Sequence, residues 1–354
     1  MKAPWRDPRS FAVSHGLIHA VVDAACVATL FGTRFAHHLT HWQAFYLIFG
    51  YDMLAFAGQG AIGPLLDRWR LLRPSILASL GLVAGGVLFL HVNPVAAAVL
   101  VALGNALYHV AAGALSLHVD PGRAAPPGIF VAPGALGLAI GTFTGKHTAV
   151  IEWPFLLALG LSLLLAWRSA HPPVRLAEPP GKGGTRYAAA LLLLLLFSIA
   201  VRSLVGRGGA YACPKLTFVA FSLGAAAFAG KALGGILADR FGWLRVGVGA
   251  LLLSAPLIVF GGADYPVVVI GMLLFQMTMP VTLVAVSVLL PGRPALAFGF
   301  CSTALIVGAI PTFFKSCKAY YGPWPFLVLI LLSAAALWVG LRGLRGVVPM
   351  KYDR

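Results

Sequence analysis

Gly63-Pro64-Leu65-Leu66-Asp67-Arg68 and Gly235-Ile236-Leu237-Ala238-Asp239-Arg240 are the two stretches that decide the fold. Each closes a long apolar segment with an Asp-Arg pair that follows a glycine by four residues. The second lies 172 positions after the first, and the same shift carries the apolar segment that begins near residue 15 onto one that begins at Tyr187. The chain therefore repeats internally, which indicates two related halves.

The composition around these stretches indicates a membrane protein. The chain has 354 residues, of which 60% are hydrophobic and 10% charged, and its mean hydropathy is +0.90. A soluble domain carries roughly 25% charged residues, so a water-facing surface could not be covered here. No cleavable signal peptide is expected, because the first apolar segment carries His15, His19 and Asp23 and no small-residue cleavage pattern follows it.

The apolar segments predict twelve transmembrane helices, since a hydrocarbon core takes about 20 apolar residues per helix. They are expected at 11–33, 43–66, 72–92, 94–117, 127–145, 152–167, 187–205, 214–237, 244–261, 266–290, 294–314 and 324–342. The predicted fold is an all-α membrane protein with two pseudo-symmetric six-helix bundles, 1–168 and 187–354, joined by a Pro- and Gly-rich linker at 169–186.

The basic residues predict the orientation. If the N-terminus is cytoplasmic, 18 of the 26 Lys and Arg residues lie in inner segments and 6 in outer ones. The positive-inside rule then puts both termini and the linker in the cytoplasm, with the protein integral to the cytoplasmic membrane. Despite a net charge of +16, no basic patch with interleaved aromatics appears, so no nucleic-acid partner is expected.

The stretch that continues from Gly235 through Asp239 and Arg240 to Gly242 and Arg245 resembles the cytoplasmic loop signature of the major facilitator superfamily, Gly-x-x-x-Asp-Arg/Lys-x-Gly-x-x-Arg/Lys. The first copy is similar, although Arg70 stands where the second glycine is usual. The resemblance covers essentially the whole chain and implies a solute transporter rather than an enzyme. The residues that would latch the inner end of the bundle are Gly63, Asp67, Arg68, Arg73, Gly235, Asp239, Arg240 and Arg245. The carboxylates are expected to accept hydrogen bonds from helix N-termini and to pair with arginines; alternatively, the basic residues merely hold the topology.

The fifth predicted helix carries glycines at intervals of nine and four, followed by Thr142 and a further glycine. These glycines are Gly128, Gly137, Gly141 and Gly145. The pattern is similar to the helix 5 motif of the family's antiporters and implies export by exchange, although Thr142 replaces the motif's proline and Lys146 its last glycine. Glycines also occur wherever helices pack closely. The strings Gly104–His109 and Gly128–Val131 resemble, more weakly, the fosmidomycin-resistance group of this family.

Polar residues at membrane depth are the candidate solute and proton pathway, because ionisable groups there usually face the interior of a bundle. His15, His19 and Asp23 form one stripe on the first helix. Helical rise places five groups at a similar depth of about 20 to 24 Å from the inner helix ends; they are Asp23, Asp52, Asn105, Arg202 and Gln276. We expect Asp23, with His19, to titrate during transport, with His109 as a third helper or as a packing residue.

Arg202 is expected to offer a positive charge to an anionic part of the solute, or to pair with Asp23 or Asp52 when the cavity is empty. A purely structural ion pair between Asp52 and Arg202 is the alternative. The predicted function is secondary active transport of a small organic solute, by proton-coupled efflux and alternating access, with proton-coupled uptake by symport as the runner-up. The predicted partners are the solute, protons and the lipid bilayer, and the protein is expected to be a monomer without a cofactor.

Two further function classes remain open. His15, His19 and Asp23 have a spacing that could ligate a divalent ion, but no Cys-x-x-Cys or His-rich tract accompanies them, so no metal site is predicted. A membrane-embedded enzyme would need a nucleotide loop, a nucleophile elbow or paired carboxylates, none of which the sequence carries. Cys213 and Cys317 fall in predicted outer loops, where a disulfide is an open alternative.

Overall fold

The computed structural model is helical throughout the residues that it describes, which are 10–147, 150–173, 185–209, 217–262 and 264–344; no strand occurs in these ranges. The elements are α1 (Phe11–Ala36), α2 (His41–Asp52), the π-helix η3 (Met53–Ala57), α3 (Gly58–Trp69), α4 (Leu72–Leu88), α5 (Pro94–Val119), α6 (Ala125–His147), α7 (Glu152–Arg168), α8 (Thr185–Gly209), α9 (Thr217–Phe241), α10 (Trp243–Phe260), α11 (Tyr265–Gln276), α12 (Thr278–Leu289), α13 (Pro294–Ala309), the 3-10 helices η5 (Ile310–Phe313) and η6 (Lys315–Tyr320), and α14 (Pro323–Leu344).

Nine helices within the described residues are long and apolar enough to cross a membrane, with α11 and α12 forming one continuous span. The apolar helix α4 is shorter, at 17 residues. The predicted helix at 43–66 is divided by η3, which begins directly after Asp52. A π-helical turn inside an α-helix often marks a functional position.

The boundaries follow local sequence chemistry. Thr40 and Gln43 form a capping box that starts α2. Asn93 accepts hydrogen bonds from the backbone N–H groups of Val95 and Ala96, and Pro94 occupies the first turn of α5. The prediction of one helix over 72–92 was therefore wrong at its end: α4 stops at Leu88, and 89–93 form the turn that prepares this cap.

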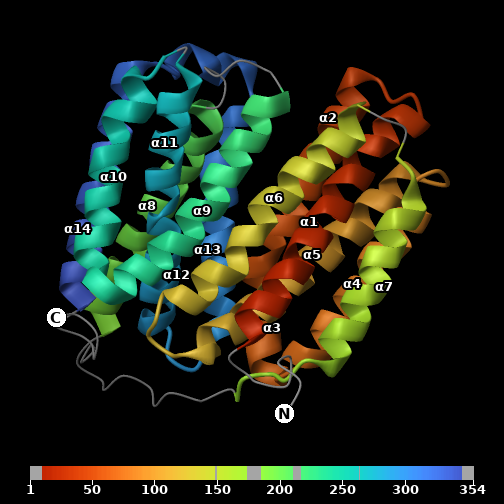
Figure 1. Cartoon of the computed structure of the whole chain (residues 1–354), viewed down its shortest axis with the longest axis horizontal. Helices are drawn as coiled ribbons and strands as arrows, with labels where there is room; N and C mark the ends of the chain where they lie inside the picture. Colours follow the sequence, from red (N-terminus) through yellow and green to blue (C-terminus); the bar gives the residue numbers. More distant parts are fainter. Residues whose placement is uncertain (1–9, 148–149, 174–184, 210–216, 263, 345–354) are drawn as a thin grey trace.

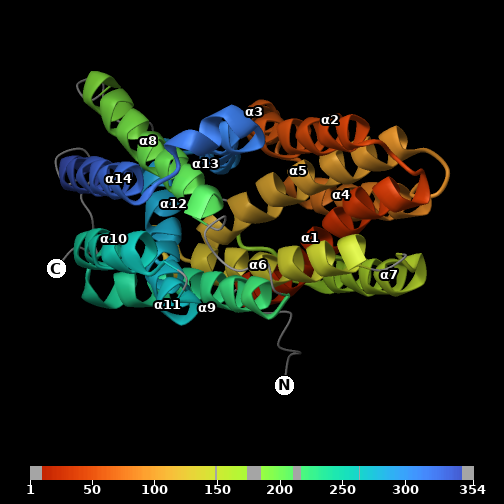
Figure 2. The same cartoon turned by 90° about the horizontal axis from the view of Figure 1, so that it is seen from above.

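The helices form two groups, α1 to α7 and α8 to α14 (Figure 1). In the first group α1 packs on α6 and α5, and α4 packs on α5 and α7; in the second group α14 packs on α8 and α10, and α11 packs on α9 and α10. Contacts between the groups run from α6 to α9 and from α3 and α5 to α13. Seen from above, α6 and α9 lie side by side between the groups, and α3 adjoins α13 (Figure 2).

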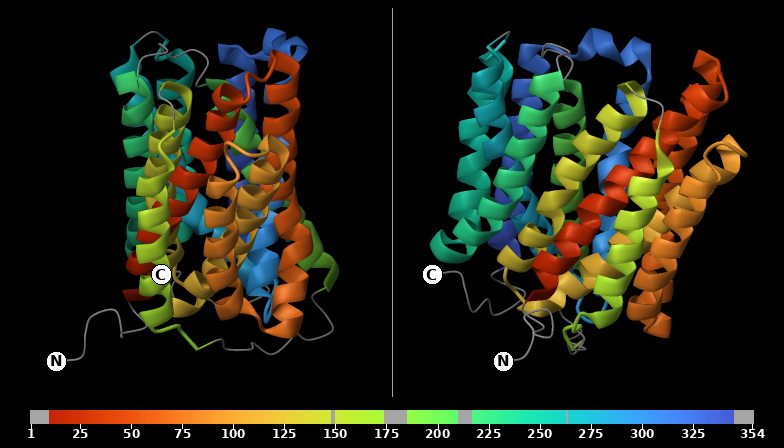
Figure 3. Two further views of the ribbon diagram at one scale, coloured as in Figure 1. Left: turned by 90° about the vertical axis from the view of Figure 1, so that its right-hand side faces the viewer. Right: turned by 45° about the vertical axis from the view of Figure 1, so that its right-hand side comes forward.

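The two groups meet at the end of the molecule where α1 begins and α14 ends, and they lean apart toward the opposite end (Figures 1 and 3). The predicted linker residues 174–184, the predicted helix start at 214–216 and both predicted cytoplasmic termini, 1–9 and 345–354, lie outside the described residues.

Candidate functional site

Asp67, at the end of α3, caps a helix of the other group. Its Oδ1 accepts a hydrogen bond from the backbone N–H of Ala295 at 3.0 Å, and its Oδ2 accepts one from Leu296 at 2.9 Å. These N–H groups open α13, so the carboxylate meets the positive end of the helix dipole. Gly63, one turn earlier, lies against the same backbone, where an added Cβ would stand 2.9 Å from Leu296 Cα. The glycine thus permits the approach that the cap requires.

Asp239 repeats this arrangement from the second group to the first. Its two oxygens accept hydrogen bonds of 2.8 Å from the N–H groups of Ala124 and Ala125, at the start of α6. Trp243 Nε1 donates a third hydrogen bond, at 3.3 Å. An added Cβ on Gly235 would stand 2.9 Å from Ala125 Cα. The two motif carboxylates therefore join the groups reciprocally at one end of the molecule.

The four motif arginines do not pair with these carboxylates in the described part of the chain. Arg68, Arg73, Arg240 and Arg245 are all exposed. Arg73 donates to the carbonyl of Trp167 at 3.2 Å, and the Arg240 guanidinium lies over the Phe241 ring at 5.4 Å. The carboxylates contact backbone N–H groups instead of the expected arginines.

Arg70 adopts a left-handed backbone conformation with φ 56° and ends α3. Its counterpart after the shift of 172 residues is Gly242, with φ 97°. Glycine reaches positive φ without steric cost. Arg70, which replaces the usual second glycine in the first motif copy, therefore stands at a position where the backbone adopts the left-handed conformation.

The helix 5 glycines pack α6 against its neighbours. Added Cβ atoms on Gly137, Gly141 and Gly145 would meet the carbonyls of α1 residues Ala20, Ala24 and Ala28, respectively. On Gly128 the same atom would stand 2.8 Å from the Lys231 carbonyl on α9. These glycines bring the backbones of α1, α6 and α9 into close contact.

His19, Asp23 and His109 meet between α1 and α5. His19 Nε2 lies 3.1 Å from Asp23 Oδ2, His109 Nε2 lies 3.6 Å from Asp23 Oδ1, and the two Nε2 atoms are 2.7 Å apart. Asn105 Nδ2 donates to Asp23 Oδ1 at 3.1 Å. Gly134 of α6 leaves room for this group, because an added Cβ there would stand 2.7 Å from Asp23 Oδ2. We call His19, Asp23, Asn105 and His109 the carboxylate–histidine cluster.

The backbone fixes the tautomers of both histidines. His19 Nδ1 lies 3.0 Å from the carbonyl of Phe130, and His109 Nδ1 lies 2.9 Å from the carbonyl of Asn105. A carbonyl only accepts, so both Nδ1 atoms carry the hydrogen. If both imidazoles were neutral, each Nε2 would then present a lone pair to the other, and neither could donate a hydrogen bond. Their separation of 2.7 Å is a hydrogen-bond distance and calls for one proton between them.

The same three side chains have donor atoms within 4.8 Å of one another, which raises the question of a metal ion. Two nitrogen ligands of a tetrahedral zinc ion stand about 3.3 Å apart, given bonds of about 2.05 Å. The observed separation of 2.7 Å is too short for that geometry and fits a shared proton. The cluster is therefore suited to holding one proton beside a carboxylate.

His15, the third member of the predicted stripe, lies apart from the cluster. Its Nε2 contacts Ser169 Oγ at 2.9 Å, and its ring stacks on Phe11 with 4.0 Å between centroids. Tyr108 donates to its backbone carbonyl at 2.7 Å. His15 therefore fastens α1 to the start of the predicted linker.

Arg202 and Asp52 do not pair with each other. Arg202 of α8 donates to the hydroxyls of Thr278 and of Thr282, the latter at 2.9 Å. Asp52 instead lies 3.5 Å from Arg207, whose guanidinium also lies over the Phe313 ring at 4.9 Å. The predicted pairing of Arg202 with Asp23 or Asp52 is thus not what the structure contains.

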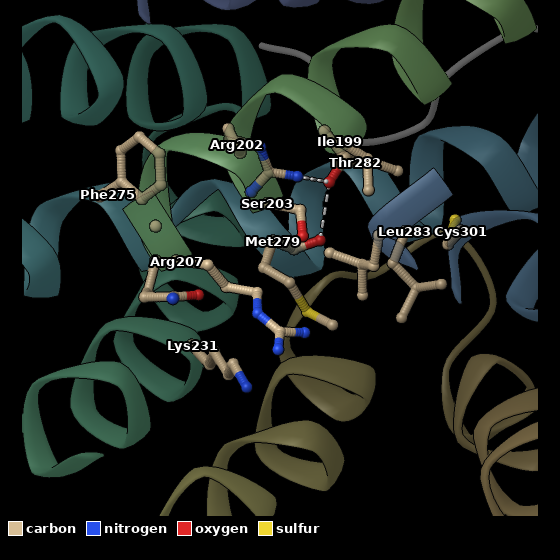
Figure 4. Close-up of a pocket in the computed structure, with 13 residues that line it drawn as sticks. Ile199, Arg202, Ser203, Arg207, Lys231, Phe275, Met279, Thr282, Leu283 and Cys301 are labelled. Atoms are coloured by element: carbon tan, nitrogen blue, oxygen red, sulfur yellow. Dashed lines mark hydrogen bonds between the residues drawn. The ribbon is translucent and has the colours of Figure 1, made fainter. Parts of the chain in front are cut away.

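A cavity of about 270 Å³ lies within the second group, lined by α8, α9, α11, α12 and α13. Gln276 lines it together with three cations, Arg202, Arg207 and Lys231, whose side chains Figure 4 shows around the cavity. Of the five groups predicted to share one cavity, Arg202 and Gln276 line this one, Asp23 and Asn105 belong to the cluster, and Asp52 reaches the cavity through Arg207.

Sequence reasoning missed four participants: Lys231, Arg207, Thr278 and Thr282. Lys231 is the only cation in the interior of the predicted helix 214–237, since Lys215 stands at its start, and that signal could have found it. The two threonines carry no such signal, because a threonine in an apolar helix usually bonds its own backbone. The Cys213–Cys317 disulfide, which the sequence left open, lies partly outside the described residues, which include Cys317 but not Cys213.

Comparison with known proteins identifies the fold. No model of a known protein family matches the sequence, and no curated protein matches it by sequence. In structure, the chain is similar to the E. coli fucose:proton symporter FucP, with a TM-score of 0.73, 16% identity, and coverage of 96% of this chain and 99% of that one. A structure of the major facilitator superfamily transporter FucP in the outward conformation gives a TM-score of 0.71, 15% identity, and coverage of 96% and 98%.

The human organic anion transporter MFSD10 (TETRAN) gives a TM-score of 0.73 at 15% identity, with coverage of 95% of this chain and 100% of that one. The chain therefore shares the fold of these solved transporters over nearly its full length. The likeness to the fosmidomycin-resistance group stays a prediction.

Proposed function

We propose that this protein is a proton-coupled secondary transporter of a small organic solute that works by alternating access. The observation that carries the proposal is the carboxylate–histidine cluster, a buried proton site in one group of helices, beside a solute-sized cavity in the other. The shared fold supports it, and one protein with that fold is a fucose:proton symporter.

The proposed architecture is twelve spans in two six-helix bundles, with both termini in the cytoplasm and the protein a monomer in the cytoplasmic membrane. The capping contacts of Asp67 and Asp239 would then close the cytoplasmic end, and the leaning apart of the two groups would open the outer end. In this proposal the state described is outward-facing, and release of these two caps would accompany the opening to the cytoplasm.

In this mechanism the proton occupies the cluster, where Asp23 balances the imidazolium that His19 and His109 share. Several polar groups surround Asp23 and interact with its charge. They are His19 and Cys26 on its own helix, Tyr51 on α2, Asn105, Tyr108 and His109 on α5, and Lys231 on α9. From α6, Phe130 adjoins the cluster with its carbonyl and with its ring, which stacks on His19 at 5.0 Å between centroids, and Gly134 adjoins Asp23. A change of state that rehydrates the cluster would release the proton.

The glycine pattern of the fifth predicted helix, which is α6 in the structure, predicts export by exchange. In the structure these glycines pack α6 against α1 and α9. One observation favours the runner-up, symport. Lys231 lines the cavity and its charge lies within range of Asp23, so neutralising Asp23 changes the field that a solute meets in the cavity. Both directions are therefore kept as candidates, and vesicles with a defined orientation separate them.

The test is reconstitution into liposomes with an imposed proton gradient and a solute panel, with internal pH and solute followed together. Asp23→Asn should abolish gradient-driven flux while protein yield and thermal unfolding stay unchanged. Asp264→Asn, at an exposed helix cap, is the matched control and should transport normally. If flux in Asp23→Asn still depended on the proton gradient, the proposed role of Asp23 would be wrong.

A further inference from the structure

The cavity in the second group carries unbalanced positive charge. Arg202, Arg207 and Lys231 line it, and no described lining residue is acidic. Arg207 has a carboxylate partner in Asp52, outside the lining. Arg202 has only neutral hydroxyl partners, and no ion pair in the described part of the chain involves Lys231. Two cations in the wall therefore form no ion pair with a described residue.

Arg202 leaves one donor unsatisfied. The residue is 6% exposed, and its two terminal nitrogens bond Thr278 and Thr282, while its Nε is buried without a partner. A buried donor of a charged group that lacks a partner is costly. Thr282 in turn donates to the carbonyls of Met279 and Thr278, so its oxygen is held in place to accept from the guanidinium (Figure 4). The arginine is fixed in position with capacity for one more acceptor.

Lys231 lies between this cavity and the proton site. Its carbonyl packs on Gly128 of α6, and Gly134 of the same helix packs on Asp23 and His19. Lys231 and Asp23 thus contact positions of α6 that are only six residues apart, so we expect their charges to interact, although no hydrogen bond joins them. An anion placed beside Lys231 would meet repulsion from an ionised Asp23 and none from a neutralised one.

The remaining walls are apolar. Ile199, Phe275, Met279, Leu283 and Leu305 supply them. A cavity of about 270 Å³ lies at the small end of ligand sites, which run from about 300 to 1,000 Å³. The cavity thus suits a compact molecule with one charged end and an apolar body.

We propose that the cavity binds a small organic anion, with its carboxylate or equivalent oxyanion between Arg202 and Lys231, and that Lys231 makes anion binding cooperative with protonation of the cluster. This inference rests on the proposed function and specifies its substrate class. The anion and the proton would then be bound at the same time, as symport requires.

Charge-matched ligands test the substrate class. Binding of acetate, benzoate and succinate to the detergent-solubilised full chain is compared with binding of acetamide, benzamide and benzylammonium. At least one anion should bind saturably, about tenfold or more tighter than its neutral or cationic counterpart, and more tightly at pH 6 than at pH 8. Equal binding of anions and amides, or no anion binding at all, would overturn the inference.

Variants test the assigned residues. Lys231→Met should lower the affinity for the anion by about tenfold and remove most of its pH dependence, whereas Lys231→Arg should keep the affinity and its pH dependence. Arg202→Gln should weaken binding but keep the pH dependence, because of the two proposed anion-binding cations only Lys231 interacts with Asp23. Lys315→Met, at an exposed lysine outside the cavity, is the control and should bind as the parent protein does. A pH dependence that persists in a folded Lys231→Met protein refutes the coupling.

The result also separates the two proposals. Gradient-driven flux of a neutral solute that is lost in Asp23→Asn would keep proton-coupled transport and remove the anion inference. Saturable anion binding without flux of any solute would keep the anion site and remove transport.

Discussion

His19 Nε2 lies 2.7 Å from His109 Nε2, and both rings have their Nδ1 turned to a backbone carbonyl. Neither ring can flip to offer its Nδ1 without losing that hydrogen bond, so the pair accepts one proton between two fixed nitrogens. Asp23, 3.1 Å from His19, supplies the balancing charge. A residue of α1 and a residue of α5, 90 positions apart in the sequence, are thereby held together as one unit.

Replacement of His109 by Gln tests this unit. The amide cannot take up a proton at neutral pH, so the two side chains could no longer share one. We expect gradient-driven flux to fall by about tenfold or more and its pH profile to move, measured in liposomes between pH 5 and 8. His118→Gln, on the same helix, is the matched control. An unchanged pH profile in His109→Gln would contradict the shared proton.

Replacement of Asp67 by Asn tests the latch. The asparagine can accept only one of the two backbone hydrogen bonds and carries no charge, so contacts worth about 1.5 to 3 kcal/mol each are weakened. The closed end should open more often, which is measured as faster labelling of a cysteine placed at Thr303, in a background without other reactive cysteines. Thr303 lies at this junction, since its Oγ1 is 3.4 Å from the carbonyl of Ala57.

Asp239→Asn should act in the same direction, because Asp239 makes the reciprocal cap. Asp120→Asn, at an exposed i,i+3 ion pair, serves as control and should leave labelling unchanged. If the cysteine is labelled at the same rate in all three variants, Asp67 and Asp239 do not keep this end of the molecule closed.

Replacement of Arg70 by Gly tests the left-handed helix end. Arg70 has φ 56°, and a non-glycine residue in this region costs roughly 1 to 2 kcal/mol. Glycine removes that cost but adds freedom to the unfolded chain, so the net gain should be about 0.5 to 1 kcal/mol. Thermal unfolding in detergent should show a higher Tm, whereas Arg68→Gly, inside α3, should lower it. A lower Tm for Arg70→Gly would show that its side chain, not its backbone, matters.

Much of the fold followed from local patterns. Long apolar segments and turn residues predicted helices that begin and end within a few residues of those in the structure, as with 94–117 and Pro94–Val119. The end of α4 was misplaced because Phe89 and Leu90 are apolar and continue the hydrophobic run, while the turn is set by the Asn93 cap. The π-helix after Asp52 has no signal in composition.

The sequence by itself determined that the chain is apolar enough to span a bilayer repeatedly, that its halves repeat around Asp67 and Asp239, and that Asp23 and His19 share a helix face, because periodicity and composition are local properties. Only the tertiary structure decided the partners: His109 for His19, Arg207 for Asp52, two threonines for Arg202, and Lys231 between the proton site and the cavity. These pairings depend on how helices distant in sequence are rotated and packed together, at glycines where their backbones come into close contact. The residue spacing along any one helix does not encode that geometry.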